Sequence, residues 1–575
     1  MEKDISNWLN LADKFAAEGN PQGMRACAQE IWEAEPGSPE GAAIMAQAAL
    51  YSGNTDAAAS IVAELLQHEP GHLRGRLVQA GIAAREFRLD EEIPLLRQLI
   101  PELTAASQGQ AAQPGATFLL RQAYGWLADA LYLAADPQGA GEAMLALSKL
   151  SAEPYERAVF YSKYLFLSTY RASAAPADQR AAARHYEELL QVVPYRHARS
   201  YKPDKKLRIG YISPDFREHA VANFVAPLVQ DFDGDRFTVF CYSLSRPDRV
   251  TQRLRHGQAT WRSLAGRSPH TAARLIAEDE LDILVDLSGH SDNNALPVMA
   301  YRPAPLQISG IGYTATTGLS TIDYFLSDET CLPGGDELAA SCFTERILRL
   351  PHSHLCYAPG AVHRLPPAGT EPPWLRNGYV TFGSFNNFAK VTDDTLLMWR
   401  EILDRVPDSH LVLKGKICSI PSGCQIVRER LRRLSFDTAR VELRPYSPDY
   451  LEQYRDIDIA LDTMPYNGGL TTCEALYMGV PVVTLRGRSH GSRFGASILH
   501  NAGVDELVVE SDINYVRRAV QLGSTPNLVA AYHSGLRANL ERSALMNRSQ
   551  YMAELESAYR RAWQLFCRQS HDDAE

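Results

Sequence analysis

The spacing of apolar residues divides the chain into a helical first part and an alternating second part. Up to about residue 195 the chain is rich in Ala and Leu, and apolar residues recur at helical spacing, as at Ala58, Ile61 and Leu65. Beyond about residue 205, short apolar runs alternate with segments of helical pattern. This change predicts an all-α region followed by an α/β region.

Turn residues recur in the helical region with the period of a tetratricopeptide helix pair, which is about 34 residues. Gly19-Asn20 recurs as Gly53-Asn54, and Glu35-Pro36-Gly37 recurs as Glu69-Pro70-Gly71. Glycine suits the tight turn between two helices, and proline ends the second helix because it cannot continue it. Stacked helix pairs present a concave surface, so we expect a protein partner here. An accidental match in a generic helical domain is the alternative. Degenerate repeats are predicted around 119–133 and 141–149.

The alternation in the second part predicts parallel strands covered by helices on both faces. A Pro-rich stretch at 359–373 separates two such units, so we expect domain bounds at 1–200, 201–365 and 366–575. Open parallel sheets bind ligands at the carboxyl ends of their strands, which predicts a site in the cleft between the two α/β domains. The strand candidates are residues 207–212, 237–242, 282–287, 379–383, 410–414, 457–461 and 480–484.

Composition and charge narrow the functional classes. Hydrophobic residues make up 45% and charged residues 22% of the 575 residues, as in an ordinary globular protein. The net charge of -10 argues against nucleic acid as the main ligand. The opening MEKDISNWLN has no apolar run typical of a signal peptide, and no apolar run is long enough to span a bilayer. We therefore expect a soluble, cytoplasmic protein without a membrane partner.

The cysteines and paired acids predict no metal site. The nine cysteines are scattered, and no pair has the two-residue spacing of a zinc or redox motif. Cys418 and Cys424, the closest pair, bracket a segment with Pro421 and Gly423 that is interpreted as a loop. The acidic pair in 456–458 leads into a strand candidate and is interpreted as structural. Reduced thiols are expected in this compartment.

A glycine-rich loop that opens a helix is the most informative candidate site. In LDTMPYNGGLTTCEALYMG, residues 461–479, a strand ends before Gly468 and Gly469, and a helix opens at Thr471 and Thr472. Glycines let the backbone approach a ligand, and the N–H groups of an open helix N-terminus attract a diphosphate. Glu474, one turn further, is suited to accept hydrogen bonds from ribose hydroxyls. Plain helix capping is the alternative interpretation.

Further polar residues follow other predicted strands. In TFGSFNNFAK, residues 381–390, a strand runs into two asparagines, and Lys390 is suited to neutralise the β-phosphate of a leaving group. In LRIGYISPDFREHA, residues 207–220, His219 follows a strand and a turn, where an imidazole can touch a reacting centre. His290 and Tyr313 are expected at the rim of the first sheet. A solvated lysine and satisfied structural histidines are the alternatives.

Other chemistries lack their motifs. We find no G-x-S-x-G elbow in a strand–turn–helix setting, no Walker loop and no H-E-x-x-H. These absences argue against a serine hydrolase of the elbow type, a P-loop enzyme and a zincin.

Four ordered segments resemble the O-GlcNAc transferase and SPINDLY family of protein glycosyltransferases. They are residues 207–219, YRPAPLQISGIGYTATTG at 301–318, FGSFNNFAK at 382–390, and LDTMPYNGG followed by TTCEALYMGVP within 461–481. The resemblance covers almost the whole chain. It implies two Rossmann-like domains of the glycosyltransferase-B type after the repeats. It also implies inverting, metal-independent transfer of one sugar from a nucleotide-sugar to Ser or Thr of an acceptor protein, which binds through the repeats.

The resemblance also implies roles for individual residues. His219 matches the family's active-site histidine near the acceptor hydroxyl and the sugar, and Lys390 matches the lysine that binds the diphosphate. His290, Tyr313 and Asp279 are assigned to the acceptor and sugar side. A chain of waters leading to Asp279 or to solvent is the alternative to His219 as the acceptor of the proton. The donor is expected to contact Asn386, Asn387, Tyr450, Gly468, Gly469, Thr471, Thr472, Glu474 and Arg493, with Tyr450 near the base.

Three positions depart from the animal O-GlcNAc transferases and look more like SPINDLY. This chain has Gly469-Leu470 where those enzymes have His-Thr, Glu474 where they have Asp, and Asp282 where they have a histidine proposed as a base. Because plant SPINDLY uses GDP-fucose, the resemblance favours GDP-fucose slightly and leaves UDP-GlcNAc open. A non-catalytic repeat scaffold with a decayed enzyme domain, or a transferase acting on Asn or a non-protein acceptor, is the alternative. The oligomeric state stays open.

Overall fold

The fold is described from a computed structural model of the chain. It describes residues 5–108, 113–171, 175–197, 201–360, 362, 365–367 and 371–572, so part of the Pro-rich stretch at 359–373 lies outside the described residues. Internal contacts divide the chain into two compact units, residues 1–164 with 416–430, and residues 165–415 with 431–575. This division differs from the expected bound at residue 200, because residues from 165 onward group with the α/β unit.

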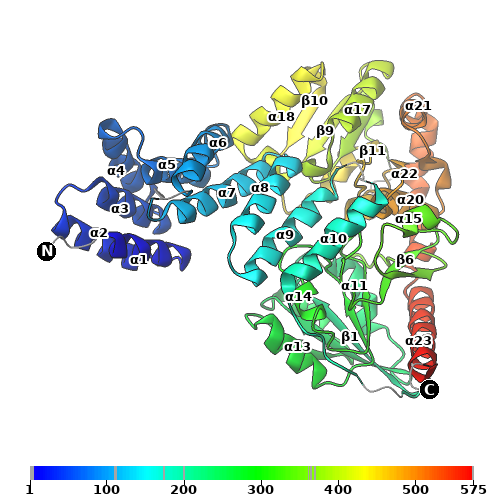
Figure 1. The fold of residues 1–575 in the computed structure, drawn as a ribbon. Helices are drawn as coiled ribbons and strands as arrows, with labels where there is room; N and C mark the ends of the chain where they lie inside the picture. Colours follow the sequence, from blue (N-terminus) through cyan, green and yellow to red (C-terminus); the bar gives the residue numbers. More distant parts are fainter. Residues whose placement is uncertain are drawn as a thin grey trace. The chain divides into compact units, whose positions relative to one another are not determined.

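The first unit is a succession of helices joined by short turns (Figure 1). Gly19 and Gly53 take positive φ angles of 65° and 81°. Asn20 and Asn54 follow them and cap the next helices, accepting hydrogen bonds from the backbone N–H of Gly23 at 3.0 Å and of Ala57 at 3.2 Å. Equivalent turns at the predicted spacing confirm the tetratricopeptide-like repeats.

The helices of this unit include the segment with Pro421, Gly423 and Cys424, which was interpreted above as a loop. They are α1 (Ile5–Ala17), α2 (Pro21–Ala34), α3 (Pro39–Tyr51), α4 (Thr55–His68), α5 (Leu73–Arg85), α6 (Leu89–Ala106), α7 (Ala116–Leu133), α8 (Pro137–Leu150), most of α9 (Pro154–Ser168), η2 (Lys416–Ser419) and most of α18 (Pro421–Arg433).

The second unit contains two parallel sheets, which confirms the α/β prediction. The seven-stranded sheet has the order β3-β2-β1-β4-β5-β6-β7, and the six-stranded sheet has the order β10-β9-β8-β11-β12-β13. The strands are β1 (Leu207–Ser213), β2 (Phe237–Ser243), β3 (Thr260–Ser263), β4 (Ile283–Asp286), β5 (Leu306–Ser309), β6 (Tyr324–Asp328), β7 (Arg346–Leu350), β8 (Thr381–Ser384), β9 (His410–Lys414), β10 (Val441–Arg444), β11 (Ile459–Leu461), β12 (Val482–Leu485) and β13 (Val508–Val509).

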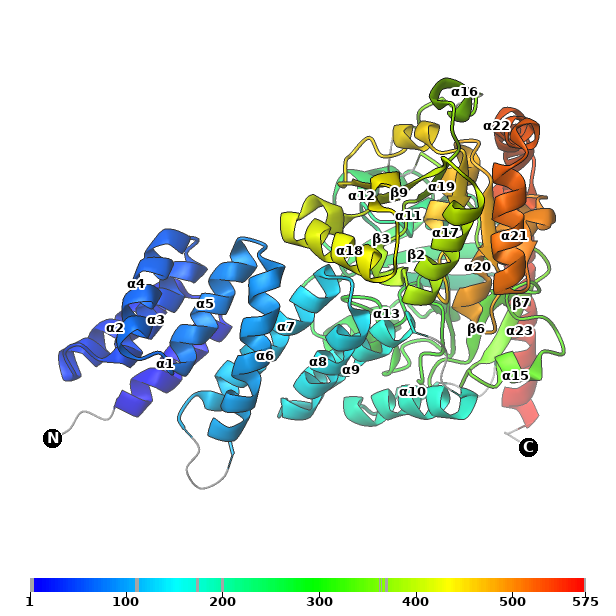
Figure 2. The same cartoon turned by 90° about the horizontal axis from the view of Figure 1, so that it is seen from above.

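Helices and single 3-10 turns connect these strands, and Figure 2 shows α17, α21 and α22 beside the six-stranded sheet. The α-helices are α10 (Pro176–Leu190), α11 (Ala222–Gln230), α12 (Arg249–Leu254), α13 (Pro269–Ala277), α14 (Leu296–Met299), α15 (Glu337–Ala340), α16 (Trp374–Asn377), α17 (Asp393–Arg405), α19 (Leu470–Tyr477), α20 (Phe494–Asn501), α21 (Asp512–Gly523), α22 (Pro526–Glu541) and α23 (Arg548–Asp572). The 3-10 turns are η1 (Phe388–Lys390), η3 (Thr438–Arg440), η4 (Glu452–Asp456), η5 (His490–Arg493), η6 (Asp505–Leu507) and η7 (Ala544–Met546).

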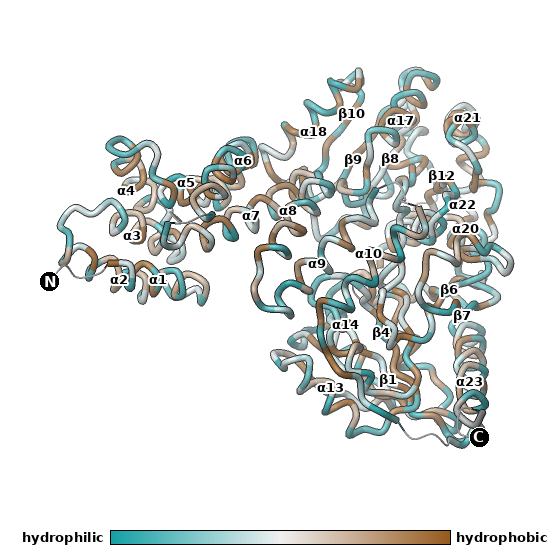
Figure 3. The backbone as a smooth tube through the Cα atoms, in the orientation of Figure 1, coloured by the Kyte–Doolittle hydropathy of each residue, from teal (hydrophilic) through white to brown (hydrophobic). Residues whose placement is uncertain are grey.

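The central strands are buried along nearly their whole length. β1 lies between β2 and β4, with Ile209 paired to Val239 on one side and to Ile283 on the other. Strands that are covered on both faces consist mainly of apolar residues. Figure 3 shows hydrophobic colour along β1 and β4. The predicted strands correspond to β1, β2, β4, β8, β9, β11 and β12.

Six strands were missed. β3 and β10 are edge strands with mostly exposed or half-buried residues, so they lack the apolar run that marks a strand in the sequence. β13 has two residues, and β5, β6 and β7 are as long as predicted strands such as β4 and β9, so length does not explain why they were missed. Within the described residues, no helix is both long and apolar enough to cross a membrane.

Each sheet reverses its strand order next to the first strand of its series. The reversal lies between β1 and β4 in the first sheet and between β8 and β11 in the second. The loops after these neighbouring strands diverge to opposite faces and leave a crevice at the carboxyl ends, where open α/β sheets bind ligands. The predicted site segments follow these four strands.

Candidate active site

The reversal point of the second sheet brings two predicted segments together. The hydroxyl of Thr471 donates a hydrogen bond to Oδ1 of Asn386 at 2.8 Å, which joins the loop after β11 to the loop after β8. Nζ of Lys390 donates to the backbone carbonyl of Asn467 at 2.9 Å. The hydroxyl of Thr472 donates to the carbonyl of Gly468 at 3.0 Å. The amide, ammonium and hydroxyl groups therefore surround the start of α19.

Gly468 is required by the close approach of these side chains. A Cβ atom built on Gly468 would lie 2.6 Å from the hydroxyl oxygens of both Thr471 and Thr472, and 3.0 Å from Oδ1 of Asn386. A Cβ on Gly469 would lie no closer than 3.8 Å to the side chain of Phe494. The first glycine is therefore fixed by packing, and the second has room.

Asp462, which the sequence analysis missed, holds the loop in place. Its buried carboxylate accepts hydrogen bonds from the backbone N–H of Gly468 at 2.7 Å and of Thr463 at 2.8 Å, and from the hydroxyl of Thr484 at 2.6 Å. Burial raises the pKa of Asp462 to about 6. Its only sequence signal is a carboxylate directly after a strand and before a glycine-rich loop.

The ammonium group of Lys390 lies beside an aromatic ring and near a carboxyl group. Its ammonium nitrogen lies 4.3 Å from the centre of the Tyr466 ring, a cation–π distance. Burial lowers the pKa of Lys390 to about 8, and the nearby carboxyl of Asp462 raises it in part. An ammonium group that has already lost much of its water interacts strongly with an incoming anion.

Glu474 and Tyr450 form a buried pair beside this loop. The hydroxyl of Tyr450 donates a hydrogen bond to Oε1 of Glu474 at 2.5 Å. Burial raises the pKa of Glu474 to about 8, and the hydrogen bond from Tyr450 lowers it. Burial and the adjacent Glu474 raise the pKa of Tyr450 above its usual value. The two residues predicted to contact ribose and base thus lie side by side.

His219 lies at the carboxyl end of β1, before α11. Its side chain is 41% exposed, and Nδ1 lies 3.5 Å from Oδ1 of the buried Asp215. Nδ1 also lies 3.3 Å from the backbone nitrogen of Val221. The tautomer with its proton on Nδ1, facing Asp215, is the one that leaves Nε2 as a hydrogen-bond acceptor. Burial raises the pKa of Asp215, and His219 lowers it in part. An exposed imidazole supported by a carboxylate differs from a packed core histidine.

His290 and Tyr313 pack against each other at the carboxyl end of the first sheet. Their ring centres lie 5.3 Å apart, and Tyr186 of α10 packs on His290 at 4.7 Å. Nε2 of His290 lies 2.9 Å from the carbonyl of Thr317, and burial lowers the pKa of His290 to about 4. His290 is therefore a neutral, buried residue that supports the rim.

The chain matches the glycosyl transferase family 41 model over residues 169–358 and 373–555. It belongs to glycosyl transferase family 41. It is 40% identical over 382 residues to a probable UDP-N-acetylglucosamine–peptide N-acetylglucosaminyltransferase SPINDLY of Petunia hybrida, which covers 64% of this chain and 40% of that protein. The SPINDLY of Arabidopsis thaliana is 39% identical over 380 residues, with the same coverage. The chain thus spans about two fifths of the length of these relatives.

A solved structure supports the fold of this family 41 chain over nearly its whole length. A mutant O-GlcNAc transferase of Thermobaculum terrenum is 28% identical, with a TM-score of 0.63 and coverage of 98% of both chains. The expected glycosyltransferase-B fold after helical repeats is therefore confirmed, as is the resemblance to the SPINDLY type. The family match begins at residue 169, so it includes α10, whose Tyr186 supports His290.

Two acids of the family 41 region lie away from the candidate site. Asp279 precedes β4, and its carboxylate is bound by Arg262 and by the hydroxyl of Tyr242 at 2.8 Å. Asp282 also precedes β4 and pairs with Lys205 at 2.9 Å. Both acids lie at the amino end of β4, opposite to the end that leads to His290. The interpretation of Asp279 as the end of a proton path therefore loses its geometric support.

Two other predicted donor contacts have structural partners. The guanidinium of Arg493 bonds the carboxylate of Asp336 at 2.8 Å and the carbonyl of Cys331 at 3.2 Å. Oδ1 of the exposed Asn387 caps η1 by accepting a hydrogen bond from the N–H of Ala389 at 3.2 Å. Donor contacts by Arg493 and Asn387 stay predictions.

Proposed function

We propose that this chain transfers a single sugar from a nucleotide-sugar onto the Ser or Thr hydroxyl of an acceptor protein, with inversion and without a metal ion in the chemistry. The observation that carries the proposal is the convergence of Asn386, Lys390, Gly468 and Thr471 at the reversal point of the second sheet. Membership of family 41 and the printed names of the SPINDLY relatives support the same reaction class.

The donor diphosphate would bind at the start of α19. Backbone N–H groups at this helix end carry a partial positive charge, and Lys390 adds a full charge from the neighbouring loop. Glu474, one turn further along α19, would bind the ribose. Tyr450, which is hydrogen-bonded to Glu474, would bind the base. This arrangement recognises a nucleoside diphosphate and does not discriminate between sugars.

The reaction would be a direct displacement. The acceptor oxygen forms a bond to the anomeric carbon while the bond from that carbon to the diphosphate oxygen breaks, so the leaving group departs with the electron pair. Lys390 and the α19 N-terminus stabilise the charge that develops on this leaving group, and such preorganised groups are typically worth about 10²–10³ in rate. His219, supported by Asp215, would accept a hydrogen bond from the attacking hydroxyl.

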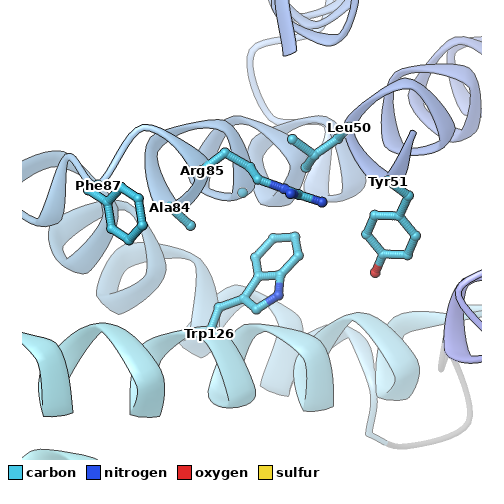
Figure 4. A pocket seen from close by; sticks show the side chains of 7 residues that line it. Leu50, Tyr51, Ala84, Arg85, Phe87 and Trp126 are labelled. Carbon is cyan, nitrogen blue, oxygen red and sulfur yellow. The ribbon is translucent and has the colours of Figure 1, made fainter. Parts of the chain in front are cut away.

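The acceptor protein would bind through the helical repeats. A pocket of about 350 Å³ opens in this unit, where Arg85 and the rings of Tyr51 and Trp126 face a common space (Figure 4). Its wall includes Phe87, which is 52% exposed and therefore accessible to a partner. Aromatic rings together with an arginine are the groups that dominate binding at protein interfaces.

Point variants test the acceptor proposal without removing the repeats. Phe87→Ala should reduce transfer to proteins of a host lysate, while hydrolysis of the donor should stay unchanged. Tyr155→Ala is the matched control, since Tyr155 is 51% exposed in the same unit and lies outside the pocket. Equal transfer by both variants would argue for a glycan or small-molecule acceptor instead.

Within this proposal, the identity of the nucleotide-sugar donor is decided separately. Gly469-Leu470 and Glu474 match the SPINDLY pattern, which slightly favours GDP-fucose, while the names of the relatives specify UDP-N-acetylglucosamine. A screen of UDP-GlcNAc, UDP-glucose, GDP-fucose and GDP-mannose decides this, read by donor hydrolysis and by the intact mass of a co-expressed acceptor. The added mass identifies the sugar directly.

Lys390→Ala provides the negative control for the screen. It should lower transfer of the preferred sugar by about 10²–10³ while the fold is kept. Lys206→Ala, which removes an exposed lysine at the start of the first sheet, should leave transfer unchanged. Near-normal turnover by Lys390→Ala would overturn the assignment. If neither GDP nor UDP binds at millimolar concentration in calorimetry, the chain is a non-catalytic scaffold.

A further inference from the structure

Three buried side chains with metal-binding atoms meet at the junction of the two sheets. Sγ of Cys331 and ring nitrogens of His354 and His490 all lie within 4.8 Å of one another. The three residues are 0%, 1% and 3% exposed, respectively. Cys331 follows β6 and His354 follows β7, both in the first sheet, whereas His490 follows β12 of the second sheet. This group has no signature in the sequence because its members lie far apart along the chain.

Each imidazole has an outer partner on one of its two ring nitrogens. Nδ1 of His354 is hydrogen-bonded to the carboxylate of Asp328, and Nε2 has no partner among the described residues. Nε2 of His490 lies 3.0 Å from the hydroxyl of Ser327. Nδ1 of His490 has no hydrogen bond of good geometry. The backbone of Thr314 lies nearby and raises the pKa of His490 in part.

Two buried ring nitrogens without good partners are unusual, because buried polar atoms are nearly always satisfied. The Asp328 carboxylate also accepts hydrogen bonds from the N–H of Cys331 at 2.7 Å and from the hydroxyl of Ser497 at 2.7 Å. A histidine that is held by a carboxylate on one nitrogen and directed by the other toward a shared point is the usual outer arrangement of a metal ligand. A pair of stray polar atoms in a packed core would not explain this arrangement.

We propose that Cys331, His354 and His490 form a binding site for Zn²⁺. One thiolate and two imidazoles suit this cation, and three protein ligands leave a fourth position for water. With Zn–S of about 2.3 Å and Zn–N of about 2.0–2.1 Å, tetrahedral ligand atoms lie roughly 3.3–3.7 Å apart. Side-chain shifts of about 1 Å would therefore close the present group around an ion. The thiol of Cys331 would release its proton to solvent on binding.

Three protein ligands and a water are the pattern of catalytic zinc sites, but the burial of all three ligands gives this site a structural role. Its ligands come from both sheets, and the adjacent Arg493 bridges the same segments through Asp336 and the carbonyl of Cys331. A bound ion would fix the relative position of the two α/β domains and so stabilise the second unit. The sugar-transfer chemistry proposed above needs no metal, so neither proposal rests on the other.

Metal analysis of the full-length protein tests the site. Protein purified without chelators should contain about one zinc per chain, and metal-depleted protein should bind one equivalent of Zn²⁺ in calorimetry with a rise in melting temperature. Co²⁺, used as a spectroscopic probe, should produce a thiolate-to-cobalt charge-transfer band at one equivalent. Failure of the depleted protein to bind stoichiometric Zn²⁺, or a cobalt complex without a thiolate band, would overturn the proposal.

Variants then locate the site. Cys331→Ala and His490→Phe should each abolish the cobalt band, and Asp328→Asn should weaken Zn²⁺ binding about 10–100-fold by releasing His354. Cys241→Ala is the matched control, because Cys241 is equally buried in β2 and lies outside the group. If Cys331→Ala retains wild-type zinc affinity, the ion binds elsewhere and the proposal is wrong. If a variant fails to fold, the wild-type cobalt spectrum decides.

Discussion

Adding one methyl group at Gly468 tests whether the crowded start of α19 is the diphosphate site. In Gly468→Ala the new Cβ would lie 2.6 Å from the hydroxyl oxygens of Thr471 and Thr472. Real Cβ atoms do not approach so closely, so the two threonine side chains must move. Thr471 would then lose the hydrogen bond that it donates to Asn386 at 2.8 Å.

The expected magnitude follows from these contacts. Overpacking by one methyl group costs about 1–3 kcal/mol, and one lost hydrogen bond costs about 0.5–1.5 kcal/mol. We expect about 1.4–2.8 kcal/mol of this cost to appear as weaker ligand binding. Because about 1.4 kcal/mol corresponds to a factor of ten, the affinity for a nucleoside diphosphate should fall about 10–100-fold. The remainder should appear as a lower free energy of unfolding.

Gly469→Ala is the matched control in the same loop. Its Cβ would lie 3.8 Å from Phe494, which is ordinary van der Waals contact. We expect its GDP and UDP affinities, measured by calorimetry, to stay within about threefold of wild type, or about 0.6 kcal/mol. Wild-type affinity in Gly468→Ala would refute the diphosphate assignment, whereas equal losses in both variants would show that Gly469 also contacts the ligand.

Three further predictions concern titratable residues of the site. Because the pKa of Lys390 is lowered to about 8, nucleoside diphosphate affinity should fall about tenfold per pH unit above that value; a flat calorimetric profile up to pH 9.5 would contradict this. The raised pKa of Glu474, about 8 against 4.5, contributes stability that is present below pH 4.5 and lost as the pH rises to 8. Between pH 5 and pH 8, the free energy of unfolding in urea should therefore fall less for Glu474→Gln than for the wild type. Equal decreases in the two proteins would show that Glu474 does not titrate in this range. His219→Ala should lower turnover about 10²–10⁴ while nucleotide binding and the fold are retained, because the side chain is 41% exposed. Full activity would remove His219 from the site, and unfolding would make it a structural residue.

The sequence by itself determined those features that depend on neighbours along the chain. Gly19 and Asn20 form a turn and a helix cap through contacts within a few residues, so their recurrence at 53 and 54 revealed the repeat. Largely apolar runs such as residues 207–212 predicted central strands, because a strand covered on both faces is mostly apolar. The loop at Gly468 and Gly469 was recognisable because its two glycines and the following helix are neighbours along the chain.

Only the tertiary structure decided which distant residues share an environment. Asp279 and Asp282 precede β4 and His290 follows it, so this one strand carries the acids and the histidine to opposite ends of the sheet. Burial and long-range contacts set the pKa values of Lys390 and Glu474, which no local pattern encodes. The meeting of Cys331 and His490 depends on the packing of two separate sheets. Electrostatics and ligand geometry act through space, so spacing along the chain could not reveal them.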